Sequence, residues 1–361
     1  MAHESQERYS ELVLAKLRSE LVLKDGVVFN NDYDGDPAAG AVKIPTRDDE
    51  VAASDYDRAA GLAPTTGNTA YTTLPINRDK AVNEIIDGYD AASVPDALIA
   101  ERLDSAGYSL GRAMDIDGAS ELLGAGTVTG AGTVDKDTVY SVLVDQRTRM
   151  SKDNIPAAGR YALCTPDVIA AVVRSPEFTQ ASSLGDEVKQ SGAIGRIAGF
   201  NVIEFNDDTP NLAMICGHPR FATRVNAWQA PVRLQSLDGS GKYIGASAVQ
   251  GRMVYAHKVL RQKGVRCVYA PGSVSIVAAP GSTSGATVLT LSDASGATAW
   301  KYTRNPAARA VFGESYTGTA LTSGTTQISA AAGDVLEVAG LKDGKVISAG
   351  YLTLAASNLK A

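Results

Sequence analysis

The stretch AVKIPTRDDEVAASDYDRAAGLAPTTGNTAYTTLPI, residues 41–76, decides how the rest of the chain is interpreted. The two end pieces, AVKIPT and TAYTTLPI, alternate apolar and polar residues as strands do. Between them, residues 46–68 are polar, charged and poor in bulky apolar side chains, so this part cannot form a core of its own. We therefore predict a long two-stranded finger that packs on something outside its own domain, the alternative being a disordered loop.

Charged side chains of both signs lie along this finger. Mixed charge suits contact with complementary groups on a neighbouring surface, although a plain solvated loop has the same composition. The residues we expect to make such contacts are Lys43, Arg47, Asp48, Asp49, Glu50 and Arg58.

The segment that leads into the finger, NNDYDGDPAAGA at residues 30–41, resembles the start of a calcium-binding loop. An EF-hand loop ends with a bidentate glutamate at its twelfth position, and here that position is Ala41. A metal ion could bind only if a second chain supplied the missing oxygens, so we predict none. We interpret the segment as a hinge, because glycine frees the backbone and proline limits where it bends. The predicted hinge residues are Gly35, Pro37 and Gly40.

Upstream of the hinge, residues 5–23 have apolar residues at three- and four-residue steps, which predicts an amphipathic helix. No partner helix follows it in the chain. We therefore expect this terminal arm to dock on another part of the fold or on another subunit. The contact residues predicted for the arm are Tyr9, Leu12 and Leu17.

Downstream of the finger, the pattern predicts an α+β body in which helices and strands are mixed. The chain changes composition at Pro271, and residues 272–361 contain short β-rich pieces separated by Gly, Ser and Asp turns. This spacing predicts an immunoglobulin-like β-sandwich with Trp300 in its core. The other expected elements are helices at about 93–123, 137–152, 166–175 and 218–228, a loop at 124–134, and strands at 160–165, 192–206 and 211–217 and between 232 and 270.

Bulk composition excludes several classes of protein. The 361 residues carry a net charge of −6, which does not favour tight binding to a phosphate backbone. The three cysteines stand apart in apolar surroundings and have no CxxC spacing, which predicts buried thiols rather than a zinc site or a disulfide framework. The N-terminal residues lack a secretory-signal layout, and no apolar run is long enough to span a bilayer.

Catalytic motifs are also missing from the sequence. The three histidines are far apart, and we expect His257 to be structural. GSGK at residues 239–242 lacks the P-loop frame, and GSTSG at 281–285 has Thr283 where a nucleophile elbow needs serine. An enzyme with an unrecognised pair of carboxylates is the alternative, but no carboxylate stands in apolar company that would raise its pKa. We therefore predict that the protein is not an enzyme and holds no cofactor.

Taken in order, these segments resemble the major capsid proteins of tailed bacteriophages, which have the Hong Kong 97-type fold. The resemblance covers residues 1 to about 270 and rests on the arm, the charged finger, SVPDALIAERLDSAGYSLGRAMD, GRYALCTPDVIAAVVRS, GAIGRIAGFNVIEFND and ASAVQGRMVYAHKVLRQKGVRCVYA. It implies the following domains: an N-terminal arm (1–29), an extended loop (30–77), a peripheral domain (78–152) with a spine helix at about 93–123, an axial domain (153–244), returning peripheral strands (245–271) and the added sandwich (272–361).

The resemblance implies a shell subunit that self-assembles into hexamers and pentamers of an icosahedral virion capsid around double-stranded DNA, without reading its sequence. It further implies a separate scaffolding protein, a portal, decoration proteins, assembly in the host cytoplasm, no membrane, and a sandwich that is exposed on the surface. We also expect that deletion of residues 272–361 leaves shell formation possible. The alternative is a bacterial surface or adhesion protein with an immunoglobulin-like module, which the missing secretion signal does not favour.

Overall fold

The structure is a computed structural model, and it describes residues 18–36, 38–46, 53–59, 61–62, 69–93, 98–176, 195–292 and 296–360. The chain divides into two compact units, and each is built from two stretches of sequence. The first unit is Met1–Gly124 with Arg220–Leu260, and the second is Ala125–Pro219 with Arg261–Ala361.

The first unit contains a two-stranded hairpin and, among the described residues, a sheet of three strands in the order β3-β10-β9. The finger prediction is confirmed for its strands: β1 and β2 pair antiparallel, with Val42 opposite Leu74 and Ile44 opposite Thr72. The elements of this unit are β1 (Ala41–Thr46), β2 (Ala70–Pro75), β3 (Arg78–Asp87), α1 (Gly88–Ser93), α2 (Leu98–Ala125, whose last residue belongs to the second unit), β9 (Ala222–Ser236), the 3-10 turn η2 (Asp238–Ser240) and β10 (Ala246–Val259).

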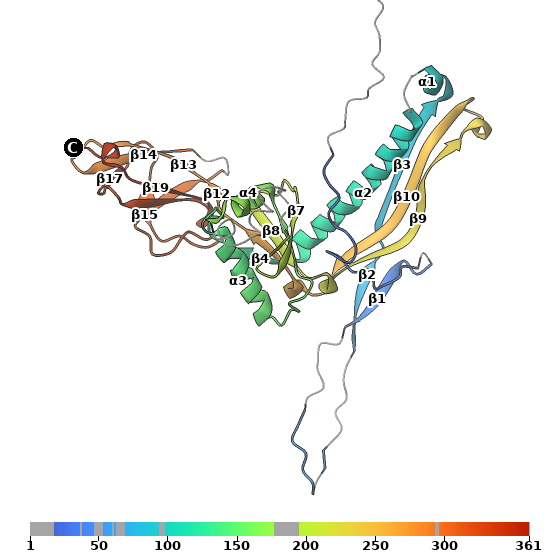
Figure 1. Cartoon of the computed structure of the whole chain (residues 1–361), viewed down its shortest axis with the longest axis horizontal. Helices are drawn as coiled ribbons and strands as arrows, with labels where there is room; N and C mark the ends of the chain where they lie inside the picture. The colour runs from blue at the N-terminus through green and yellow to red at the C-terminus, as the bar shows by residue number, and fades with distance from the viewer. Residues whose placement is uncertain are drawn as a thin grey trace, which may run out of the picture. The chain divides into compact units, whose positions relative to one another are not determined.

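Helix α2 runs along one face of the sheet β3-β10-β9 (Figure 1). Val82 and Ile86 of β3 point toward the helix and pack with Val249 of β10 and with Ala106 and Leu103 of α2. The alternate residues of β3 point the other way and are exposed. The strand therefore has the period-two pattern of a sheet with one covered face.

Two helix predictions in this unit need correction. The arm was expected to be helical over residues 5–23, but residues 18–23 are not helical, and residues 1–17 lie outside the described part. The long helix expected at about 93–123 is confirmed as α2, Leu98–Ala125, and only its start needs correction: α1 ends at Ser93, and residues 94–97 lie outside the described part. Amphipathic spacing is a weak guide where tertiary contacts compete for the backbone.

The helix predicted at 218–228 is wrong as well. The structure has a single 3-10 turn, η1 (Pro219–Phe221), followed by the long strand β9. β9 pairs antiparallel with β10 from Ser236 opposite Ser247 to Ala222 opposite Val259, with irregularities near Gln250 and Tyr255. The distant partner strand decides this conformation, and a local pattern does not contain it.

The second unit is built on a mixed sheet whose order, among the described residues, is β4-β11-β8-β5-β7-β6. Its central strands β5 and β8 are buried along their whole length, as their continuous apolar sequences predict. The elements of its core are β4 (Thr127–Gly130), α3 (Val139–Lys152), β5 (Tyr161–Cys164), α4 (Pro166–Arg174), β6 (Arg196–Ile197), β7 (Phe200–Glu204), β8 (Leu212–Gly217), the 3-10 turn η3 (Gln262–Gly264) and β11 (Val265–Tyr269).

Most predictions for this core are confirmed. Val139, Leu143 and Met150 of α3 are buried, and α4 begins with proline and carries Arg174 in its last turn. The predicted loop at 124–134 is wrong in part, because residues 127–130 form β4 and pair parallel with β11. The chain passes from one compact unit to the other at 124/125, 219/220 and 260/261. The predicted domain boundaries at 152/153, 244/245 and 271/272 stay a prediction.

The C-terminal part of the second unit has two stacked β-sheets, as predicted (Figure 1). Leu336 and Val338 pack with Leu289 and Ile328 between the sheets, and Trp300 is partly buried against this cluster. The strands are β12 (Gly272–Ser273), β13 (Ser275–Pro280), β14 (Ala286–Ser292), β15 (Ala299–Arg304), β16 (Thr319–Leu321), β17 (Gln327–Ser329), β18 (Val335–Lys342) and β19 (Lys345–Thr353), followed by the 3-10 turn η4 (Ala356–Asn358). One sheet has the order β12-β19-β18-β15-β16, and the other has the order β13-β14-β17.

Candidate assembly surfaces

The base of the N-terminal arm is fixed to the first unit by buried groups. We call residues 22–30 the arm anchor. Within it, Leu23, Val28 and Phe29 have at most 1 % of their surface exposed. The anchor ends in backbone hydrogen bonds from Asn30 N–H to the Ala222 carbonyl, 2.9 Å, and from Arg224 N–H to the Asn30 carbonyl, 2.8 Å. The arm therefore enters the fold as an ordered segment beside β9.

Arg224 of β9 is the centre of this anchor. Its side chain is 7 % exposed and donates three hydrogen bonds: to His257 Nε2 at 2.9 Å, to the Leu23 carbonyl at 2.7 Å and to Asp25 Oδ1 at 3.0 Å. The guanidinium also lies 5.2 Å from the centre of the Phe29 ring. One planar donor group thus joins two parts of the arm to β10, which a lysine could not do with the same geometry.

The same network fixes the protonation of His257. Because Arg224 donates to Nε2, that nitrogen carries no proton and the neutral ring holds its proton on Nδ1. Burial, reinforced by the positive charge of Arg224, lowers the pKa of His257 to about 3. The ring packs against Phe29 and Tyr255, with centroids 4.9 Å and 5.4 Å away. His257 is therefore a structural residue, as predicted.

A carboxylate on α2 holds the first part of the anchor. Asp115 Oδ2 accepts hydrogen bonds from the backbone N–H groups of Val22 at 2.9 Å and of Leu23 at 3.4 Å. Burial raises the pKa of Asp115 despite these bonds. Upstream, Arg18 pairs with Asp104 at 2.6 Å, and the Tyr108 hydroxyl donates to the Ser19 carbonyl at 3.0 Å. The Asp115 bonds use the backbone donors of Val22 and Leu23, and the Tyr108 bond uses the Ser19 carbonyl as acceptor. A helix would have used these backbone groups within itself, which explains why residues 18–23 are not helical.

The base of the finger is fixed by an apolar cluster. Ile44 of β1 and Leu74 of β2 are buried with Val225 of β9 and Ala256 of β10. The rest of the hairpin is more exposed, and Tyr71 has 64 % of its surface accessible. Farther along the finger, Tyr56 and Leu62 are 71 % and 54 % exposed. Large apolar side chains on a thin exposed element are typical of surfaces that become buried in an assembly.

The predicted contact residues fall partly outside the described chain. Lys43 and Arg58 are described, and both are exposed on the finger. Their contacts with a neighbour stay a prediction, as do those of the rest. The undescribed ones are Arg47, Asp48, Asp49 and Glu50 of the finger, and Tyr9, Leu12 and Leu17 of the arm.

The predicted hinge has one residue with a different role. A Cβ added to Gly35 would lie 2.8 Å from Ala227 Cα, so glycine is needed there for close packing on β9. Gly40 has a φ of +65° and an open surrounding, which fits a turn that can pivot, and Pro37 lies outside the described residues. Close packing therefore gives Gly35 a role that was not predicted, and the hinge itself stays a prediction.

The sequence did not indicate that a cluster of charged and aromatic side chains lies on the exposed face of the sheet β3-β10-β9. On that face Arg252 pairs with Asp79 and lies 5.6 Å from the centre of the Trp228 ring, which is 46 % exposed. These three residues border a shallow pocket of about 410 Å³ that also touches Asp36 and Gly40 at the root of the finger. Trp228 was assigned to a helix, so its place in a strand beside Arg252 could not be anticipated.

The described residues contain no group of three or more side chains suited to binding a metal ion. Within the same residues, no helix is both long enough and apolar enough to cross a membrane. The three cysteines are buried free thiols, as predicted, and burial raises the pKa of Cys164 and Cys267 to about 12. Thiols with such pKa values are inert at neutral pH.

Comparison with known proteins assigns this fold. The sequence profile described as phage capsid protein matches residues 84–269, just over half of the chain. A search among curated proteins finds no match. Solved structures that resemble the chain include that of Mycobacterium phage Che8, with 21 % identity and a TM-score of 0.60 over 73 % of this chain and 96 % of that one.

Two further structures give the same result. The capsid structure of the cyanophage P-SCSP1u has 14 % identity and a TM-score of 0.61, over 73 % of this chain and 92 % of that one. The capsid of the native GTA particle has 13 % identity and a TM-score of 0.52, over 74 % and 95 %. At these identities the likeness shows the fold, which is the Hong Kong 97-type capsid fold, and the profile match shows the family. The chain therefore belongs to the phage capsid protein family, whose members are structural proteins of the virion shell rather than enzymes.

Proposed function

We propose that the protein is the shell subunit of an icosahedral phage head, forming hexamers and pentamers that enclose double-stranded DNA. The observation that carries the proposal is the finger. Its base is buried through Ile44 and Leu74, while Tyr71, Tyr56 and Leu62 are exposed beyond it. A thin extended element that packs little against its own chain is stabilised when it packs against neighbouring subunits. A capsid interface buries a large total area through many such contacts.

In this proposal, finger and arm both bind adjacent subunits, through the residues predicted above. The finger contributes Lys43, Arg58 and the acidic run that includes Asp48. The first unit then corresponds to the extended loop and the peripheral domain, and the core of the second unit to the axial domain. The C-terminal sandwich lies beyond residue 269, where the family profile ends, and we place it on the outer surface of the shell.

Several partners belong to the proposal and await their own tests. They are a separate scaffolding protein, a portal and decoration proteins, with assembly in the host cytoplasm. No finding favours the alternative of a bacterial adhesin.

Size-exclusion chromatography and negative-stain electron microscopy of the expressed chain, alone and with a co-expressed scaffolding protein, test the proposal. We expect oligomeric capsomers or closed particles. A strictly monomeric protein under both conditions would refute it.

A further inference from the structure

The C-terminal sandwich has an unusual covered face. In β18, residues 336–341 are all buried, so both sides of this strand are shielded from water. Leu336 and Val338 face the second sheet, whereas Ala339 and Leu341 form a separate cluster with Ala310, Val346, Ala349 and, at its edge, Tyr316. The cover on the outer side is the segment between β15 and β16, residues 305–318, which we call the strap.

A buried carboxylate holds the strap against β18. Glu337 is fully buried, and its Oε1 accepts hydrogen bonds from Ala310 N–H at 2.5 Å and from the Tyr351 hydroxyl at 2.6 Å. Its Oε2 accepts from the Tyr316 hydroxyl at 3.0 Å. A buried carboxylate is costly unless hydrogen bonds satisfy it, and two of the three donors belong to the strap. Opening the strap would therefore leave Glu337 short of donors.

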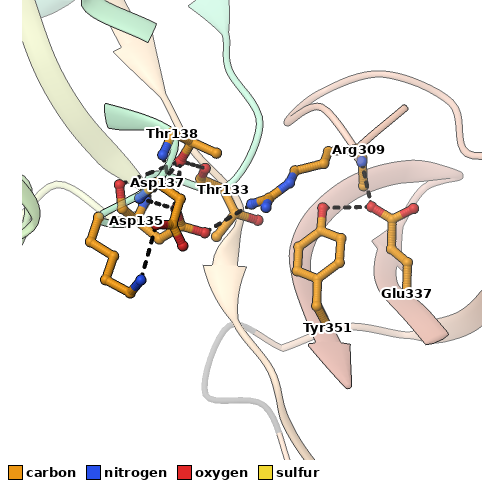
Figure 2. Close-up of polar contacts among 9 residues, drawn as sticks. Thr133, Asp135, Asp137, Thr138, Arg309, Glu337 and Tyr351 are labelled. Carbon is orange, nitrogen blue, oxygen red and sulfur yellow. Dashed lines mark hydrogen bonds and ion pairs between the residues drawn. The ribbon is translucent and has the colours of Figure 1, made fainter. Parts of the chain in front are cut away.

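The far side of the strap contacts the core of the same unit. Arg309 Nη1 donates to Asp135 Oδ2 at 2.8 Å, while the guanidinium lies 4.8 Å from the centre of the Tyr351 ring. Figure 2 shows Arg309 reaching from the sandwich to Asp135, with Tyr351 and Glu337 on the opposite side from Asp135. Arg309 thus connects the turn before α3 to the buried end of the strap.

Asp135 is itself rigidly placed. Its Oδ1 accepts from the backbone N–H groups of Asp137 at 2.9 Å and Thr138 at 3.0 Å, which leaves Oδ2 free to receive Arg309. Burial alone would raise the pKa of Asp135, but the bonds from Arg309, Asp137 and Thr138 outweigh it and hold that pKa below its usual value. The carboxylate is therefore ionised at neutral pH and already oriented toward the strap.

Two further contacts lie beside this ion pair. Phe312 N–H donates to the Ala131 carbonyl at 3.0 Å, and the Phe312 ring stacks on Tyr269 with centroids 5.6 Å apart. A Cβ on Gly130 would lie 2.2 Å from the Phe312 carbonyl oxygen, so the backbone there must be glycine. On another edge, Asn211 Nδ2 donates to the Ile347 carbonyl at 2.9 Å. The contact combines charge, stacking and close backbone approach, unlike a flexible tether.

We propose that residues 305–318 lock the C-terminal sandwich onto the core of its own chain, so that the sandwich is an integral part of the subunit rather than a tethered appendage. The lock forms in the unassembled chain and does not depend on the proposed shell function. Its docking site is the surface made by Gly130, Ala131, Asp135 and Tyr269.

Amide hydrogen exchange of the full-length, unassembled chain tests the lock. We expect peptides covering 305–318 and 127–138 to be protected together in the unmodified protein. Arg309→Ala should speed exchange in both by about five-fold, the effect of losing one half-exposed ion pair and its stacking contact. Asp135→Asn, which retains the turn before α3, should do the same. The matched control is Arg304→Ala, which removes an ion pair to Asp334 within the sandwich and should leave 127–138 unchanged.

Three results would overturn the proposal. Rapid exchange of 305–318 in the unmodified chain would mean that the strap is open. Unchanged exchange in both Arg309→Ala and Asp135→Asn would show that the ion pair does not hold the strap on the core. Protection that disappears on dilution would show that the strap docks on a second copy. None of these results depends on whether the chain forms shells, so this test and that of the proposed function fail separately.

Discussion

Replacing Arg224 with alanine tests whether the arm anchor is part of the folded subunit before any assembly. The substitution removes three hydrogen bonds from a side chain that is 7 % exposed and leaves His257 Nε2 and the Leu23 carbonyl without that donor. Each bond contributes about 1 kcal/mol, and a buried charged donor more, but the losses overlap. We expect the free energy of unfolding of the first unit to fall by about 3 kcal/mol.

The assay is urea unfolding followed by tryptophan fluorescence. The chain has two tryptophans, so Trp300→Phe leaves Trp228 on β9 as a reporter within the first unit. Arg102→Ala is the matched control, because Arg102 pairs with Glu84 at 3.5 Å and both side chains are at least 40 % exposed. Such a pair contributes less than about 1 kcal/mol.

A second observable makes the test specific. Burial is the first cause of the low pKa of His257 and the charge of Arg224 the second, so Arg224→Ala should raise that pKa while leaving it below the usual value. NMR titration of the ring protons measures this. The reasoning is refuted if Arg224→Ala and Arg102→Ala destabilise the unit equally, or if the His257 titration does not move.

Three further predictions concern Asp115, the acidic run of the finger and Asp135. Asp115→Ala should destabilise the first unit by about 1–2 kcal/mol, because it leaves two buried N–H groups without an acceptor. Asp115→Asn should cost less than half as much, because an amide oxygen can accept in place of the carboxylate. Urea unfolding of the two variants measures the difference. Reversing the charges of Asp48, Asp49 and Glu50 together to lysine should reduce particle yield more than subunit stability, and normal particles from that variant would contradict the proposed role of the finger. The pKa of Asp135 is lower in the folded protein, so its contribution to the lock is present above the unfolded value of about 4 and is lost as pH falls through the folded value. The protection factor of residues 305–318, which corrects for the slower intrinsic exchange of amides in acid, should therefore fall below about pH 4, and the fall should be smaller in Asp135→Asn.

Much of the fold could be predicted from local pattern. The finger strands, α3, α4 and the buried strands β5 and β8 have periodicities or continuous apolar runs that only one conformation buries well. The strands of the sandwich were also evident, because turn residues separate them regularly. These elements need no knowledge of a distant partner.

The elements that were missed depend on distant partners. β4 is four residues long and exists because β11 pairs with it, more than 130 residues later in the chain. β9 was assigned to a helix at its beginning because its partner β10 was not considered. The backbone of residues 18–23 bonds to Asp115 instead of forming a helix.

The contact surfaces were less accessible to sequence reasoning than the fold. The finger charges were found because they stand in a polar stretch with no core. Trp228 and Arg252 were missed because their pairing depends on strand register. The strap was missed because residues 305–318 have no distinctive pattern, and the need for Glu337 to be buried under them appears only in three dimensions. The contacts of the strap also revise one expectation. Deletion of residues 272–361 would uncover Tyr269 and Gly130. The truncated core should therefore be less stable than it would be if the sandwich were a separable domain.

The most direct test of the central claim is a cryo-electron microscopy reconstruction of particles purified after expression with a scaffolding protein. We expect closed shells of hexamers and pentamers in which Lys43 and Arg58 of each finger contact a neighbouring subunit. A monomer that never forms capsomers, or a shell in which the finger contacts only its own subunit, would contradict it.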